Sequence, residues 1–171
     1  ETAMKKKVKL LALFFSVVLV LFCGIGIFKN HQEKEEKYSY TVSQVNACLE
    51  RIVSYSKHCL ENLPAHNPND SGEIVDAFST LSLTLNNSEG LHNRNSREIS
   101  SSVQEFMDYF HGEYPRMSAA DKTACLQSLI QASEKLLSSL ETDSSEIPVD
   151  TLIQEAAAFA ASLDQIRSKT I

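Results

Sequence analysis

The chain opens with one long apolar stretch. Residues 10–28 are interrupted only by Ser16, Cys23, Gly24 and Gly26. At about 1.5 Å rise per residue, a helix of this length comes close to the ~30 Å hydrocarbon thickness of a bilayer. A helix is the form expected in lipid because every backbone N–H and C=O must find its partner within the segment. The pattern predicts a single transmembrane helix over residues 10–28.

Positive charges just ahead of this stretch indicate its orientation. Residues 1–9 contain Lys5, Lys6, Lys7 and Lys9. Basic residues flanking a transmembrane helix favour the cytoplasmic side. We therefore expect a signal anchor with residues 1–9 as a short basic cytoplasmic tail and everything after residue 28 outside the cytoplasm.

Two other fates of the apolar stretch stay open. Residues 10–22 have the length of a signal-peptide core, and residues 24–26 supply small side chains at an A-x-A-like spacing, although Phe28 keeps the region apolar. Cys23, followed by glycine, resembles a lipid-modification site, although Phe22 before it is large. Cleavage and lipidation would both still export the remainder of the chain.

The pattern changes beyond the apolar stretch. Residues 29–40 form a charged juxtamembrane segment whose Lys, Glu and Gln favour a helix. From residue 41 the apolar positions recur at steps of three and four, which is typical of an amphipathic helix packed on neighbours. Pro64 ends this helix. Its predicted core positions are Val45, Leu49, Ile52, Ser56, Cys59 and Leu63.

Four further helices follow the same spacing. Ser71, Ser96 and Ser118 are predicted N-caps, Ser118 with Asp121 resembles a capping box, and Pro148 precedes the last helix. Small side chains on the last helix allow a neighbour to approach closely. The predicted core stripe of that helix is Val149, Leu152, Ile153, Ala156, Phe159, Ala160, Leu163 and Ile166. The loops expected between helices include residues 64–70, 86–96 and 141–146.

These elements define the expected fold. Short connections make successive helices run in opposite directions. The sequence predicts an all-α chain in which the N-terminal transmembrane helix leads into an antiparallel bundle of four to five helices over residues 41–171.

Charge narrows the range of partners. Lys5, Lys6, Lys7 and Lys9 take four of the 16 cationic residues and Glu1 one of the 22 acidic residues, which leaves 12 against 21 in residues 29–171. An acidic domain without a basic stripe repels phosphate backbones. The sequence predicts no nucleic-acid partner, and homo-oligomerisation stays open.

Three cysteines follow the apolar stretch. Cys48 and Cys59 are 11 residues apart on one predicted helix, about 16 Å along its axis, so they lie too far apart to bridge. A disulfide of Cys125 with Cys48 or with Cys59, three buried free thiols, and a bridge between two molecules all remain open.

Catalytic and metal signatures are weak. His58 and Cys59 are adjacent, so on a helix they point about 100° apart. The five histidines lack partners at the three- or four-residue spacing that would build a metal face. The sequence contains no G-x-S-x-G, H-E-x-x-H or phosphate-binding glycine loop. We expect no enzyme activity, no metal and no cofactor.

One aromatic cluster stands out, near the end of the third bundle helix. Most of this aromatic area is expected to belong to the core and the residues that cover it. Met107, Tyr109 and Tyr114 could form a partner-binding patch if they are exposed together. The expected function is a membrane-anchored extracytoplasmic helical bundle that binds another protein as an assembly or scaffold factor. The alternative is the small-ligand-sensing ectodomain of a bacterial receptor-like protein, by analogy of architecture.

Overall fold

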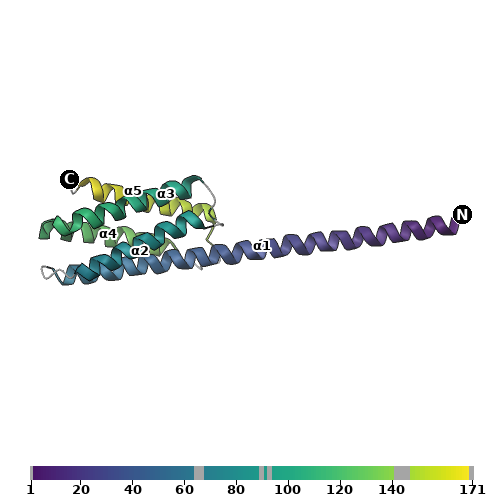
Figure 1. The fold of residues 1–171 in the computed structure, drawn as a ribbon, viewed down its shortest axis with the longest axis horizontal. Helices are drawn as coiled ribbons and strands as arrows, with labels where there is room; N and C mark the ends of the chain where they lie inside the picture. The colour runs from purple at the N-terminus through teal and green to yellow at the C-terminus, as the bar shows by residue number, and fades with distance from the viewer. Residues whose placement is uncertain (1, 64–67, 89–90, 92–93, 141–146, 170–171) are drawn as a thin grey trace. The chain divides into compact units, whose positions relative to one another are not determined.

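A computed structural model describes residues 2–63, 68–88, 91, 94–140 and 147–169, without the side chains of residues 2–14, 17, 68–70 and 94. The helices are α1 (Thr2–Glu61), α2 (Pro68–Asn87), α3 (Arg94–Glu113), α4 (Ala119–Leu140) and α5 (Val149–Lys169), with a 3₁₀ turn, η2 (Tyr114–Arg116) (Figure 1). The described residues contain no strand, so the all-α prediction is confirmed.

The chain divides into two compact units, residues 1–36 and 37–171. Residues 37–171, which we call the bundle, contain the last part of α1 and all of α2 to α5. α1 is helical without a break through the predicted juxtamembrane segment, residues 29–40.

The bundle is a closed ring of five helices. α2 packs on α3, α3 on α5, and α5 on α4. The ring is completed by α1, whose Arg51 pairs with Glu73 of α2 at 2.7 Å and whose Lys57 pairs with Glu134 of α4 at 2.7 Å. The order around the ring is therefore α1, α2, α3, α5, α4.

Helix direction around this ring departs from a purely antiparallel bundle. Helices that follow one another in the chain run in opposite directions, as predicted, but α3 and α5 run the same way (Figure 1). Their contacts agree, because Asn95 and Asp150 near the two N-termini border one groove while Glu105 pairs with Arg167 further along. The bundle thus contains one parallel pair.

The core follows the predicted stripes closely. Of the six positions predicted for α1, only Leu63 is partly exposed. On α5 only Val149 of the eight predicted positions is partly exposed. Burial of apolar surface at about 25 cal/mol per Å² is the main stabilising term for such a core. The largest fully buried side chains are Tyr114, Phe78, Phe106, Phe110, Leu49, Ile52, Ile74, Leu81, Leu91, Leu126, Leu129 and Leu140.

Two of the three predicted caps are wrong. α2 begins at Pro68, before Ser71, since proline is well suited to a first helical turn where its missing N–H costs nothing. α3 begins at Arg94, so Ser96 lies inside it. The buried Ser96 hydroxyl donates instead to the Leu91 carbonyl at 2.7 Å.

The third predicted cap is confirmed. The Asp121 amide donates to Ser118 Oγ at 3.2 Å, which satisfies one free N–H in the first turn of α4. The Asp121 carboxylate lies 2.6 Å from the same hydroxyl rather than accepting a backbone amide. Of the two hydrogen bonds that define a capping box, the one from the Asp121 amide to the Ser118 hydroxyl is therefore the one formed.

The predicted loops are only partly described. α2 extends to Asn87, and buried Leu91 anchors the polar segment that follows it. Residues 64–67, 89–90, 92–93 and 141–146 lie outside the described residues.

The apolar stretch at residues 10–28 lies within α1. Within the described part of the chain, no helix combines the length and apolarity needed to cross a membrane. The side chains at 10–14 and 17, part of the predicted transmembrane helix, lie outside that description. Eight large apolar side chains between residues 15 and 28 are 56% to 72% exposed: Phe15, Leu19, Val20, Leu21, Phe22, Ile25, Ile27 and Phe28.

Replacement of Ile52 tests whether the bundle requires the buried stripe of α1 in order to fold. Ile52 is fully buried. Ile52→Asp places a carboxylate without a partner in the core, so we expect loss of more than the roughly 2 to 5 kcal/mol typical of Ile→Ala. Circular dichroism melting of the full chain should show a bundle that is unfolded or melts far lower. Ser54→Asp, at an exposed position of the same helix, is the control, and an unchanged melt of Ile52→Asp would contradict this packing.

Candidate docking groove

A groove of about 600 Å³ runs along the bundle between the parallel helices α3 and α5. It lies within the second unit of the chain. Its lining residues are Asn95, Glu98, Ile99, Ser102, Asp150, Ile153, Gln154, Ala157, Ala160, Ala161 and Asp164. Ile99, Ile153 and Ala160 are buried and form its floor.

The walls of the groove follow helix-packing periodicity. On α5, the wall residues Asp150, Gln154, Ala157, Ala161 and Asp164 recur at steps of four, three, four and three. The first four of them are exposed, and Asp164 is half-buried. Positions on any single face of an α-helix recur at these steps, so the five residues form one face of α5. α5 therefore directs its apolar stripe to the core and a second face, with Ala157 and Ala161 between polar side chains, to the groove.

The opposite wall has the same character. Asn95, Glu98 and Ser102 follow one another at steps of three and four on α3. Their side chains are polar and short to medium in length, and Ser102 stands opposite the alanines of α5. No aromatic, Leu, Met, Lys or Arg side chain is among the described residues that line the groove.

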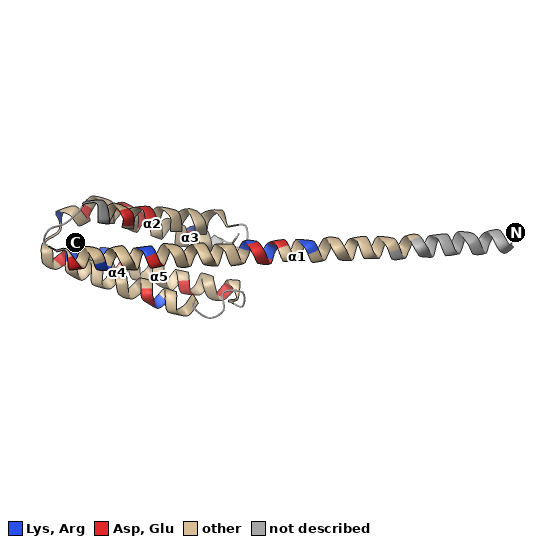
Figure 2. Cartoon of the chain, turned by 90° about the horizontal axis from the view of Figure 1, so that it is seen from below, with Lys and Arg blue, Asp and Glu red and all other residues tan. Residues whose placement is uncertain are grey.

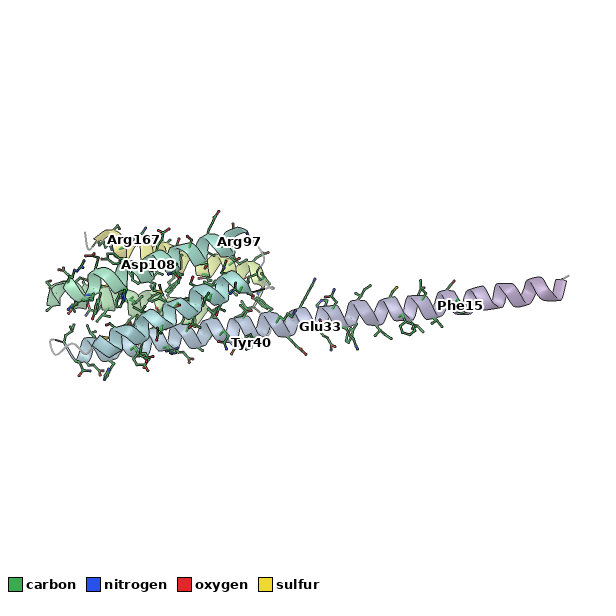
Figure 3. The ribbon with its side chains drawn as sticks, in the orientation of Figure 1. Phe15, Glu33, Tyr40, Arg97, Asp108 and Arg167 are labelled. Atoms are coloured by element: carbon green, nitrogen blue, oxygen red, sulfur yellow. The ribbon has the colours of Figure 1, made fainter. Side chains whose placement is uncertain are left out.

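The charged side chains that line the groove are acidic. Glu98, Asp150 and Asp164 line it, and none of the described lining residues is Lys or Arg. Arg97 and Arg167, labelled in Figure 3, lie on the two bordering helices without lining the groove.

Arg167 closes one end of the α3–α5 contact. Its guanidinium donates to Glu105 Oε2 at 2.8 Å and lies 3.3 Å from Asp164 Oδ1. The hydrogen bond to Glu105, followed by the nearby charge of Asp164, raises the pKa of Arg167. This pair fixes the register of the two parallel helices, although as a largely exposed ion pair it adds little to stability.

A second, smaller cavity lies between α2 and the end of α3. It measures about 300 Å³ and has the aromatic rings of Phe110 and Tyr114 at its base. The other lining residues are Ser71, Gly72, Val75, His111 and Pro115. Its lining is largely apolar and offers few groups to orient a polar ligand.

The predicted aromatic patch does not form one exposed surface. Tyr114 is fully buried, stacks on Phe110 with ring centroids 4.4 Å apart, and lies beneath the Lys122 ammonium, 5.5 Å from the ring centroid. Met107 and Tyr109 are half-buried against the core. The condition on which the patch depended, joint exposure of Met107, Tyr109 and Tyr114, is not met. Tyr114 packs in the core because α3 ends before it and η2 turns its ring inward.

The three bundle cysteines are buried free thiols in this structure. Burial raises the pKa of the Cys125 thiol to about 12, and burial also raises the pKa of Cys48 against a smaller opposing effect of Arg51. A reactive cysteine needs a lowered pKa, because the thiolate is the nucleophile. Cys125 and Cys48 therefore have the character of core residues.

Tyr114 lies close to two of these cysteines. Burial raises the pKa of the Tyr114 phenol, and Cys59, Cys125 and a hydrogen bond with Cys59 raise it further. Cys59 and Cys125 are thus neighbours of one hydroxyl, whereas Cys48 lies about 16 Å from Cys59 along α1. Of the two disulfides left open by the sequence, the arrangement favours Cys59 with Cys125.

This preference is testable with mild oxidation. Two thiols lose two protons and two electrons to an added disulfide such as oxidised glutathione as the bridge forms. We expect peptide mapping without reduction to find Cys59 joined to Cys125, unchanged in Cys48→Ser and absent in Cys59→Ser. A bridge from Cys48 to Cys125 would contradict the arrangement. So would Cys59 and Cys125 remaining open to alkylation in Cys48→Ser.

No described group of three His, Cys, Asp or Glu side chains is placed to hold a metal ion. The groove residues were not singled out by the sequence. The sequence shows the small side chains Ala157 and Ala161 on α5, but their place in a groove depends on α3 lying alongside.

Comparisons with known proteins give no support for or against a role of the groove. No family model, no curated protein and no solved structure matches this chain.

Proposed function

We propose that this protein is a non-catalytic docking or assembly factor, anchored in the cell membrane and presenting its bundle outside the cytoplasm. The observation that carries the proposal is the groove between α3 and α5. A solvent-facing seam of small side chains on two adjacent helices resembles the grooves in which amphipathic helices bind. The bundle would act by holding another protein.

The membrane part of the proposal is supported by the first unit. The eight exposed apolar side chains of residues 15–28 form a surface far more apolar than a soluble helix leaves open to water. Figure 2 shows this part of α1 without acidic or basic residues, followed by a cluster of both signs. Lys5, Lys6, Lys7 and Lys9 ahead of it favour a cytoplasmic N-terminus. Lipid is the partner that we propose for residues 10–28.

A second candidate function is favoured by the 300 Å³ cavity beside Phe110 and Tyr114. A small apolar ligand seated there would contact α2, α3 and η2 together. The protein would then be a sensing ectodomain, in which the ligand shifts the packing of these elements. The groove is the stronger candidate because its walls match a helix and its charge is uniform.

Site-specific photocrosslinking in intact cells tests the docking proposal. A photoreactive amino acid at Ala157 in the groove should capture a discrete protein partner, while the same residue at exposed Ala47 on α1 should not. Ala161→Phe fills the groove and should remove the crosslink from position 157. Equal capture at both positions, or none at Ala157, would contradict the docking role of the groove.

Accessibility labelling tests the proposed topology. Ser168 is exposed near the end of α5. Ser168→Cys, in a background with the four native cysteines replaced, should react with a membrane-impermeant maleimide in intact cells. A residue placed at Lys7→Cys should react only after lysis. The opposite labelling pattern, or recovery of the chain in the soluble fraction without residues 10–28, would contradict the anchored arrangement.

A further inference from the structure

We propose that the occupant of the α3–α5 groove is a basic α-helix of a partner protein, packed lengthwise over the alanines of α5. This inference rests on the proposed docking function and adds the chemical class of the partner. It is argued from the geometry and the charge of the groove.

The length of the groove fits a helix. Asp150 and Asp164 mark its ends on α5, 14 residues apart, which is about 21 Å or four helical turns, while on α3 its wall runs from Asn95 to Ser102, about 10 Å or two turns. A helix of roughly 15 to 18 residues covers this distance. A short loop or a single side chain would contact only part of it.

Small side chains in the lining also allow a helix to approach closely. Helices pack with their axes 8 to 10 Å apart, and the smaller values require small side chains at the contact. Ala157 and Ala161 on one wall and Ser102 on the other provide them. The occupant can therefore place medium-sized apolar side chains between α3 and α5, above the floor of Ile99 and Ile153.

Charge decides which helix fits. Glu98 stands on one wall, with Asp150 and Asp164 at the two ends of the other. Because Asn95 and Asp150 border the same end of the groove, Glu98 lies about one turn in from the Asp150 end. An occupant with two Lys or Arg side chains over that end and one over Asp164 would place opposite charges at all three positions. An acidic helix would place like charges there, and a phosphate-rich surface would be repelled as a whole.

Partial compensation within the bundle moderates this charge without reversing it. Arg167 neutralises part of Asp164, but it is shared with Glu105 and lies outside the lining. Asp150 lies in the first turn of α5, where the helix dipole favours a negative charge. Glu98 completes the acidic set from α3.

The test uses the full chain in nanodiscs and a pair of synthetic peptides. One is a helical peptide of roughly 18 residues with Lys at both ends, a further Lys one turn in from one end, and Ala and Leu on the contact face. The second carries Glu in place of Lys. We expect saturable binding of the Lys peptide alone, weakened by raised salt because exposed charges are screened. Protein-free nanodiscs of zwitterionic lipid measure any binding to the bilayer.

Matched charge variants locate the binding. The triple variant Glu98→Gln, Asp150→Asn and Asp164→Asn should weaken the Lys peptide roughly tenfold, since three exposed ion pairs are lost together and each contributes only a small part of the affinity. The control has the same change of charge on other surfaces of the bundle: Glu50→Gln, Asp76→Asn and Asp108→Asn. It should change affinity less than about twofold. Melting curves establish that both triple variants fold.

Several outcomes would overturn the inference. Equal loss in the groove and control variants would mean that only overall charge matters. Equal binding of both peptides would remove the charge argument, and self-association of the chain abolished by Ala161→Phe would assign the groove to a second copy. If no peptide binds while photocrosslinking at Ala157 persists, the partner is of another class and the docking function stands; if the crosslink also fails, both fall.

Discussion

An odd number of helices closed into a ring cannot alternate in direction all the way around, and this constraint shapes the bundle. The chain order makes every consecutive pair antiparallel, so the mismatch falls on α3 and α5, which are brought together by closure of the ring. Parallel helices gain nothing from opposed dipoles, and no direct connection ties these two. The contact is instead held by a buried floor of Ile99, Ile153 and Ala160 and by the ion pair of Arg167 with Glu105.

The same constraint explains why the groove lies where it does. The other pairs in the ring are linked in sequence or share core side chains from α1. Between α2 and α3, for example, Ser82 and Ser100 approach closely enough for each hydroxyl to donate to the other's backbone carbonyl, at 3.2 and 2.9 Å. α3 and α5 meet along their buried edges and, further along, through the exposed ion pair of Arg167 with Glu105. Their outer edges carry small and acidic side chains and leave a groove that another helix can enter.

The local helical pattern was readable from the sequence because it depends on spacing within each segment. Val45, Leu49 and Ile52 recur at helical steps whatever they face, so their burial was predictable. The first residue of each helix was less predictable. Ser96, for example, has a side chain that can cap a helix, but its hydroxyl donates to the Leu91 carbonyl instead. The burial of Tyr114 was left open by the sequence, because it depends on the turn η2, which directs the ring onto Phe110 after α3 has ended.

The groove exists because α3 packs beside α5. Its proposed use requires that the bundle and its partner are held at the same membrane surface. Docking on alanines and three exposed carboxylates would be weak, because each exposed ion pair contributes at most about 1 kcal/mol. A tether restricting the bundle and its partner to one membrane surface raises their effective concentration, so weak contacts can be occupied without a large apolar interface. A strongly apolar groove would bind helices indiscriminately. Small side chains flanked by carboxylates instead favour a helix of positive charge. The acidic character of residues 29–171 attracts such a partner before it reaches the groove.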